Sequence, residues 1–564
     1  MKSSPTHPLT LLLMAITHFT LDHTPSLVWK LVILILDVMN FWATRTLEII
    51  RHSPARRLRR SLEKCQTFEE YEPIALKLDR LNGFDVWRQN FASKRYDYKL
   101  IHERLLDLRN ARLAKDHRRI VSLLRSGLLR NFGGISSKRL YDKSYIGTKI
   151  LIEEYVTEVM ECLRFISEMD VPDNTLEVVS FLQEKLDFFH EARQTMGTTA
   201  LILQGGTLFG LCHIGVIKSL YAHDLLPNVI AGSSIGAMVG ALVCSLSPSE
   251  LEVHLNNLVD FLPSPKTVDK LGNHIMENVF RRGFSQDIMV FIEYVRQQVG
   301  DLTFEEAYLR ANRILNIVVY PTDPSFPSLM NYLSTPNVTI ISAAYCSMGY
   351  NALGRDAQPY IKTEGGKIVP YHIANRECKF MSPYYAKTVG DPSQGADPGS
   401  GIVSPYTRLT ELFNVNHFVV SLARPYLSPL IGIDFRHSES KWSFIKTIDR
   451  LISLEFRHRV EMLDRFGLLF SFLKWAVSDE TAPLYAGNQI PIVPEMKTLF
   501  RDFKRIFDVN KYDVNIPYWI QVGERSVWPL YPLLQTRCAI EFTLDDYYNM
   551  YWRNGGRSDE ETSM

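Results

Sequence analysis

The sequence predicts an α/β protein with a doubly wound, mainly parallel sheet. Between residues 200 and 241, two apolar segments each end in glycines, and each is followed by an apolar stretch that can form a helix. Strands that alternate with helices in this way form βαβ units, whose ligand crevice lies at the carboxyl ends of the strands. The runs with strand character are residues 200–204, 228–232, 314–320, 338–342 and 416–421.

The second glycine-rich turn has the pattern of a nucleophile elbow. Its sequence GSSIG fits G-x-S-x-G with Ser234 at the centre, and Ser233 is interpreted as a turn residue. Such a turn joins a strand to a helix and raises the serine hydroxyl to the top of a sheet. Gly232 and Gly236 allow neighbouring backbone to come close without a Cβ clash.

The first glycine-rich turn, Gly205-Gly206, could supply backbone N–H donors for an oxyanion. Together, the two turns predict a serine acyl hydrolase with Ser234 as the nucleophile.

Ester hydrolysis also needs a group that takes the hydroxyl proton. A triad in hydrolase order would run Ser234, Asp397 and His417. However, His417 begins an apolar strand and is interpreted as a packed histidine.

The composition is that of a globular protein of two to four domains, with 564 residues, 46% hydrophobic and 22% charged. A net charge of +1 gives no support for nucleic-acid binding. The cysteines are scattered singly, which predicts buried free thiols in a cytosol-facing protein rather than disulfides or a zinc site. They are Cys65, Cys162, Cys212, Cys244, Cys346, Cys378 and Cys538.

The N-terminus predicts an interfacial or hairpin membrane anchor. Residues 9–21 and 27–42 are apolar, although Lys30 and Asp37 interrupt the second segment. There is no charged n-region of any strength and no small-residue cleavage site, so a cleaved signal peptide is not expected. A basic cluster follows, which favours a cytosolic flank at a membrane over the alternative of a buried helical pair. Its members are Arg51, Arg56, Arg57, Arg59 and Arg60.

The region between residues 61 and 166 has a helical pattern, with apolar residues such as Ile101, Leu105 and Leu108 three or four positions apart. After residue 424 the strand signal fades, and residues 445–475 have an amphipathic, helical pattern.

Three stretches in order resemble the patatin-like phospholipase family. GGTLFGLCHIGVIKSL and AGSSIGAMVGAL resemble its glycine-rich oxyanion loop and its serine elbow. Residues 128–159 resemble the helical domain that precedes the catalytic domain in fungal and plant storage-lipid lipases. Residues 404–430 resemble the end of that catalytic domain. With the apolar N-terminus and the C-terminal segments EFRHRVEMLD and IPYWIQVGERSVWP, the chain is similar to the fungal lipid-droplet triacylglycerol lipases.

The resemblance implies four parts. Residues 1–50 would anchor the protein to a membrane or lipid droplet, and residues 51–195 would form a helical domain. Residues 196–425 would form the patatin-like catalytic domain, and residues 426–564 a helical, aromatic-rich C-terminal region.

The resemblance also implies a serine–aspartate dyad that needs no metal or cofactor. Gly205, Gly206 and Thr207 match the oxyanion loop of the family. Counting back eleven residues from the arginine of the TRL stretch leads to Asp397 as the base, although proline follows it where the family has glycine. Asp391 is the fallback candidate. Two alternatives remain open: a catalytic base at another position, and a degraded dyad that no longer supports catalysis.

The basic residue common in the family's glycine loop is replaced by Phe209, which favours a neutral acylglycerol substrate over phospholipid. We therefore expect a triacylglycerol lipase on the lipid-droplet and endoplasmic reticulum surface, with its catalytic domain facing the cytosol. The sequence indicates no nucleic-acid partner and identifies no protein partner. A phospholipase or lysophospholipase with the same site, and a catalytically impaired scaffold for other lipases, are the alternatives.

Some relatives transfer acyl groups to lysophospholipids, an activity associated with a His-x4-Asp pattern. His102 and Asp107 have this spacing but lie in a predicted helix, where such pairs are interpreted as surface residues. His458 and Asp464 are one residue too far apart. An acyl-enzyme at Ser234 could still pass its acyl group to an alcohol other than water, so a lysophospholipid acyltransferase side activity stays a prediction.

Overall fold

The chain forms two compact units, Met1–Cys65 and Gln66–Met564. In the first unit, α3 (Pro54–Leu62) carries Arg59 and Arg60 in its last turn. Among the described helices, none combines the length and the apolar character needed to cross a membrane. The predicted anchor, residues 1–50, lies outside the described residues. The computed structural model describes residues 54–169, 175–205, 208–263, 286–323, 325–349, 357–372, 379–380, 405–424, 462, 489–494 and 512–562.

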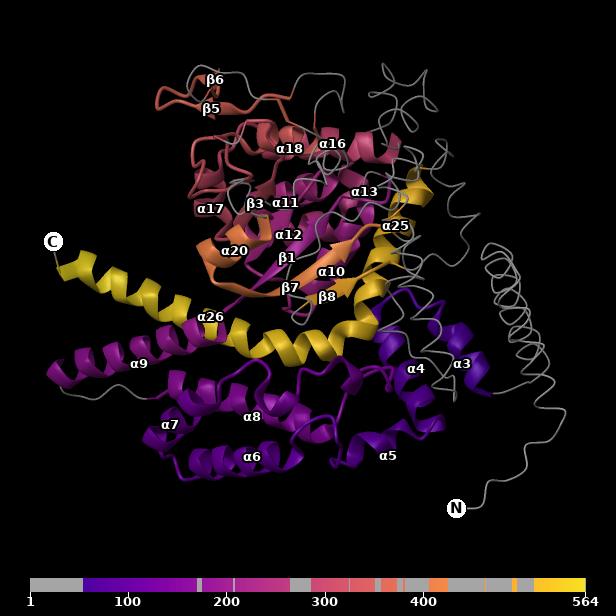
Figure 1. Ribbon diagram of the computed structural model, residues 1–564, viewed down its shortest axis with the longest axis vertical. Helices are drawn as coiled ribbons and strands as arrows, with labels where there is room; N and C mark the ends of the chain where they lie inside the picture. Colours follow the sequence, from indigo (N-terminus) through magenta and orange to yellow (C-terminus); the bar gives the residue numbers. More distant parts are fainter. Residues whose placement is uncertain are drawn as a thin grey trace. The chain divides into compact units, whose positions relative to one another are not determined.

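The second unit is built on a six-stranded sheet with the strand order β4-β3-β2-β1-β7-β8 (Figure 1). Neighbouring strands run parallel, except that β4 is antiparallel to β3. The predicted class, α/β with a mainly parallel sheet, is therefore confirmed. The strands are β1 (Thr198–Gln204), β2 (Val229–Gly232), β3 (Ile314–Val318), β4 (Leu329–Met330), β7 (Val415–Leu422) and β8 (Gln489–Ile492).

Both faces of the sheet are covered by packed side chains. Successive side chains of a strand point to opposite faces, so a single strand contributes to both clusters. Leu201 and Leu203 of β1 belong to the main hydrophobic core, whereas Ala200 and Ile202 belong to a second cluster on the other face. The main core includes α10 (Leu211–Ala222), α11 (Ile235–Ser245), α16 (Gln286–Val299), α17 (Phe304–Ala311) and α18 (Ile340–Met348). The second cluster includes residues of α20 (Pro405–Phe413).

Helix α25 (Tyr512–Val527) packs closely against α10, and two glycines make this approach possible. A Cβ atom at Gly215 would lie 1.8 Å from the carbonyl oxygen of Ile520. A Cβ atom at Gly523 would lie 2.1 Å from the carbonyl oxygen of Cys212. The aromatic-rich C-terminal segment thus covers the helix that follows the first glycine turn.

The residues before β1 form a helical module, as their periodicity predicts. Ile101, Leu105 and Leu108 are buried in its core. A two-stranded hairpin, β5 (Tyr360–Lys362) and β6 (Ile368–Pro370), lies apart from the main sheet. The module consists of α4 (Phe68–Leu81), α5 (Phe84–Gln89), α6 (Tyr98–Leu113), α7 (His117–Gly127), α8 (Ile150–Ser167) and α9 (Thr175–Met196).

The long C-terminal helix α26 (Tyr531–Thr562) joins the helical module to the sheet. It runs between the sheet and α8 and packs on α8 and α9 (Figure 1). Arg130 of the module donates to the Glu541 carboxylate of α26 at 2.9 Å, and both side chains are largely buried. Glu541 also accepts a hydrogen bond from the backbone N–H of Thr199 in β1 at 2.5 Å. One buried carboxylate therefore holds three parts of the chain together.

Four of the five predicted strands are present, as β1, β2, β3 and β7. The prediction of a strand at residues 338–342 is wrong, because helix α18 begins at Ile340. The run is apolar because α18 is buried on nearly every side, and periodicity cannot distinguish a buried helix from a buried strand. The short strands β4 and β8 were not predicted, and β8 lies beyond residue 424, where the strand signal fades.

Candidate active site

Ser234 stands at the sharp turn between β2 and α11. Its backbone has φ of 55° and ψ of −120°, a left-handed conformation that costs free energy in a residue other than glycine. The serine is only 1% exposed, and its hydroxyl makes no hydrogen bond with another described residue. A serine strained in this way at a sharp strand-to-helix turn is the feature of a nucleophile elbow.

The two glycines that flank the serine are required by close backbone contacts. A Cβ atom at Gly236 would lie 2.2 Å from the carbonyl oxygen of Leu203 in β1. A Cβ atom at Gly232 would lie 2.4 Å from the carbonyl oxygen of Gly236. Both distances are far below van der Waals contact, so the G-x-S-x-G pattern is imposed by packing within the elbow and against the neighbouring strand.

Hydrogen bonds tie the first glycine turn to the elbow. Gly205, with φ of +64°, donates its N–H to Ser233 Oγ at 3.2 Å. Its carbonyl oxygen accepts the N–H of Gly236 at 3.1 Å, and the N–H of Ser233 donates to the Leu203 carbonyl at 3.1 Å. The structure therefore brings Gly205 beside Ser234. Gly206 and Thr207 lie outside the described residues.

A serine that the sequence did not indicate supports the elbow from α18. The backbone N–H of Ser234 donates to Ser347 Oγ at 2.9 Å, and Ser347 Oγ donates to the Val318 carbonyl at 2.6 Å. Ser347 is fully buried. No local motif marks it, because it lies 113 residues from Ser234 in the sequence. Since this bond occupies the N–H of Ser234, the N–H of Ile235 is the next one along the elbow.

A second unpredicted residue, His213, lies in the first turn of α10 beside the glycine turn. Its ring is fully buried, and Nδ1 lies 2.8 Å from Ser421 Oγ in β7. Burial lowers the pKa of His213 to about 4, outweighing the backbone carbonyls of Gln204 and Gly205, which raise it. The imidazole is therefore neutral near pH 7.

His417, the histidine of the alternative triad, lies at the wrong end of the sheet. It pairs with Thr199 at the start of β1, whereas Leu203 pairs with Gly232, two residues before Ser234. Thr199 and Leu203 are four residues apart in β1, so the His417 pair lies about 13 Å along the sheet from the pair next to the elbow. Burial, followed by the nearby cations Arg130 and Arg537, lowers the pKa of His417 well below its usual value. Its interpretation as a packed histidine is confirmed, and it is excluded as a base for Ser234.

The two candidate aspartates, Asp397 and Asp391, lie outside the described residues, as do His458 and Asp464. His102 and Asp107 lie on α6. His102 is exposed and stacks on Phe91, and Asp107 lies 3.5 Å from an arginine of α7. Their interpretation as helix-surface residues is confirmed. Among the described residues, no group of histidines, cysteines and carboxylates could hold a metal ion.

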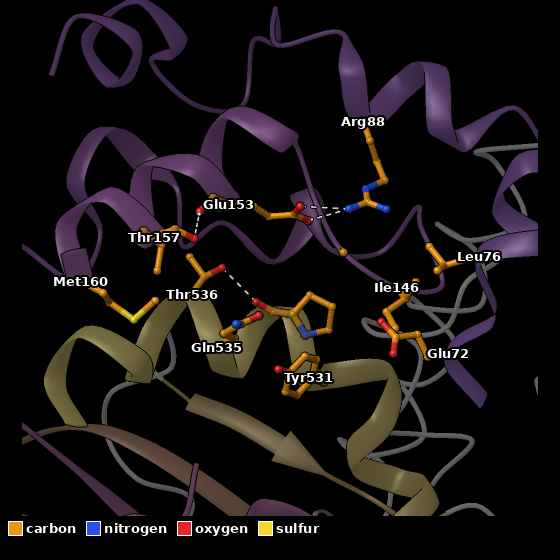
Figure 2. Close-up of a pocket in the computed structure, with 13 residues that line it drawn as sticks. Glu72, Leu76, Arg88, Ile146, Glu153, Thr157, Met160, Tyr531, Gln535 and Thr536 are labelled. Carbon is orange, nitrogen blue, oxygen red and sulfur yellow. Dashed lines mark hydrogen bonds and ion pairs between the residues drawn. The ribbon is translucent and has the colours of Figure 1, made fainter. Parts of the chain in front are cut away.

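A cavity of about 250 Å³ lies away from the elbow, between the helical module and the start of α26 (Figure 2). Arg88 and Glu153 point toward one another across its upper wall, and their side chains form two hydrogen bonds of 3.0 Å. Arg88 also donates to the Thr148 carbonyl. These charged groups are engaged with one another, and no residue of the Ser234 turn lines the cavity. It is therefore not the acyl-binding site.

A strained serine at a strand-to-helix turn, held against a glycine turn on the neighbouring strand, defines the class of serine acyl hydrolases with a nucleophile elbow. Comparison with known families gives the same result. Residues 201–359 match the model of the patatin-like phospholipases, and residues 49–194 match a domain of unknown function, DUF3336.

The chain is also similar over most of its length to several named lipases. It is 34% identical to triacylglycerol lipase 3 of Saccharomyces cerevisiae, over 95% of this chain and 96% of that protein. It is 37% identical to triacylglycerol lipase ptl1 of Schizosaccharomyces pombe, over 85% and 83%. With triacylglycerol lipase 4 of Saccharomyces cerevisiae it shares 30% identity, over 86% and 52%. The chain belongs to the patatin-like phospholipase family.

Proposed function

We propose that this protein is a triacylglycerol lipase that hydrolyses acyl esters at Ser234. The observation that carries the proposal is the strained, buried Ser234 at the end of β2, joined by hydrogen bonds to the Gly205 turn. The names of the relatives, which match this chain over most of its length, support the substrate class.

In the proposed reaction, Ser234 Oγ attacks the ester carbonyl carbon while its proton passes to a carboxylate. Asp397 is the proposed base, with Asp391 as the fallback. The tetrahedral intermediate collapses, and the alcohol leaves with the proton from the base. Water then attacks the acyl-enzyme in the same way and releases the fatty acid, so the enzyme returns to its starting state.

The oxyanion would be held by backbone N–H groups at the two turns. Gly205 already uses its N–H on Ser233, so we assign it the role of fixing the turn. The donors would then be Gly206 and Thr207, together with the N–H of Ile235 at the start of α11. The positive end of this helix would favour the same negative charge.

A neutral substrate is supported by the position of Phe209. The resemblance to the family's glycine loop implies a basic side chain at this position, whereas the ring of Phe209 is buried against Trp519 with ring centroids 5.1 Å apart. The position therefore presents no cation to a phosphate group. We propose that phospholipid and lysophospholipid are poorer substrates, and that acyl transfer to a lysophospholipid is at most a side reaction of the same acyl-enzyme.

We also propose that the protein works at the surface of lipid droplets and the endoplasmic reticulum, with residues 1–50 as the anchor. The arginines of α3, which follow this segment, support contact with an anionic lipid surface. Removal of residues 1–50 should disperse the protein while leaving hydrolysis of a soluble ester intact. Loss of that hydrolysis in a folded protein would contradict the anchor.

The decisive experiment measures fatty-acid release from emulsified triolein by the purified wild type, Ser234→Ala, Asp397→Asn and Asp391→Asn. A phospholipid substrate and a lysophospholipid acceptor are tested in parallel. We expect release by the wild type and Asp391→Asn and none by the other two, all being folded. Activity that survives Asp397→Asn but not Asp391→Asn would assign the base to Asp391. No release from any substrate, with lipid binding retained, would favour the scaffold alternative.

A further inference from the structure

The imidazole of His213 is buried, and its two ring nitrogens differ in their hydrogen bonding. Nδ1 lies 2.8 Å from Ser421 Oγ, whereas Nε2 is buried and makes no hydrogen bond of normal distance and angle with any residue in the described part of the chain. A buried donor without a partner is costly, and few such groups persist in native proteins without a reason.

The ring lies between the ends of two neighbouring strands of the sheet. Ser421 in β7 pairs in register with Leu203 of β1, the second residue before the glycine turn begins. The backbone carbonyls of Gln204 and Gly205 lie close enough to raise the pKa of the ring. Because Nδ1 is committed to Ser421, these carbonyls favour the tautomer in which Ser421 donates to Nδ1 and Nε2 carries the hydrogen.

The Gly205 carbonyl is itself part of the link between the two turns, because it accepts the N–H of Gly236. A donor aimed at this part of the backbone can therefore set the position of the glycine turn relative to Ser234. Preorganised backbone donors stabilise an oxyanion only when they are held in place before the charge develops.

We propose that His213 is a positioning residue of the acyl-transfer site: its ring, anchored to β7 through Ser421, lies beside the Gln204–Gly205 junction, and its Nε2–H attracts the carbonyls there and so keeps the glycine turn against the elbow. The proposal rests on the proposed function of Ser234. His213 does not touch the substrate in this role, and it does not accept the proton of the serine.

The test compares His213→Leu with His213→Gln in the full-length protein, using p-nitrophenyl butyrate as a soluble ester. Leucine removes the donor, whereas the glutamine amide keeps an N–H near the position of Nε2. We expect His213→Leu to lower kcat at least about tenfold, the equivalent of one hydrogen bond, with little change in KM. We expect His213→Gln to recover most of that loss.

The matched control is His223→Leu, at the C-terminal end of the same helix, where Nδ1 faces the Ser219 carbonyl of its own helix at 2.6 Å. We expect an unchanged kcat in this variant. Equal losses of kcat in the leucine and glutamine variants, in proportion to lower thermal stability, would make His213 only a packing residue and overturn the proposal.

The pH profile separates positioning from proton transfer. Above pH 5 the profiles of kcat should run parallel in the wild type and His213→Gln, since His213 stays neutral there. Loss of the acidic limb in the variant would make His213 the base and overturn the proposal.

Phosphonylation of Ser234 by a fluorophosphonate checks the proposed function separately. If the wild type neither reacts nor releases acid from any ester, the proposed function and the role of His213 fail together. If the wild type is active and both His213 variants keep the wild-type kcat, only the proposed role of His213 is refuted.

Discussion

Replacement of Ser347 by alanine should damage the elbow without touching the substrate. The hydroxyl accepts the N–H of Ser234 at 2.9 Å and donates to the carbonyl of Val318 at 2.6 Å, and all of these groups are buried. Alanine leaves a buried donor and a buried acceptor unpaired. Each costs about 1–3 kcal/mol, so we expect the free energy of unfolding to fall by about 2–6 kcal/mol.

Activity should fall further than this loss of stability explains. The left-handed backbone of Ser234 stores about 1–3 kcal/mol of strain, which persists only while its surroundings hold it. Without the Ser347 bond the turn can relax, and the hydroxyl moves from its position beside the glycine turn. We expect kcat for a soluble ester to drop at least about tenfold in a protein that is fully folded at the assay temperature.

Ser342 offers a matched control on the same helix. Its hydroxyl accepts the N–H of Tyr360 at 3.0 Å and donates to the carbonyl of Thr339 at 2.8 Å, the same two kinds of backbone bond away from the elbow, and it also accepts the hydroxyl of Thr339 at 2.8 Å. Urea unfolding should show a similar loss of stability in Ser342→Ala, with kcat unchanged. An equal loss of kcat in both variants, or wild-type kcat in Ser347→Ala, would refute the reasoning.

Two further changes test the packing and the electrostatics of the same region. Gly236→Ala should abolish ester hydrolysis and lower the melting temperature, because the added Cβ would lie 2.2 Å from the Leu203 carbonyl; a folded, active variant would show that the turn can yield. Asp287 on α16 is 5% exposed, and burial raises its pKa to about 7. The folded state therefore favours the protonated acid, and its stabilisation is lost as the pH rises from 4 to 7. Asp287→Asn should gain stability relative to the wild type over this range, by at most about 4 kcal/mol in urea titrations, and a constant difference between pH 4 and pH 8 would contradict the shifted pKa.

The parts of the site that could be predicted from the sequence are those that one segment determines. The spacing of Gly232, Ser234 and Gly236 marks the elbow within one segment, although the contact that requires Gly236 is with Leu203 on the neighbouring strand and the contact that requires Gly232 is with the carbonyl of Gly236. Likewise, the apolar residues of α6 and α8 have a helical period because each helix buries one face. The strand prediction at residues 338–342 is wrong because α18 is buried on nearly every side and has no solvated face to reveal its period.

The remaining parts depend on contacts between distant segments. Ser347 meets Ser234 only because α18 packs against the end of β3, and His213 meets Ser421 only because β1 and β7 are neighbours in the sheet. A histidine in an apolar helix and a histidine in an apolar strand look equivalent in sequence. The sheet register distinguishes them, since it puts Ser421, the partner of His213, beside the end of β1 that leads into the glycine turn, and His417 at the opposite end of the strands. Chemistry at the elbow therefore depends on neighbours that the fold, rather than any local motif, brings to Ser234.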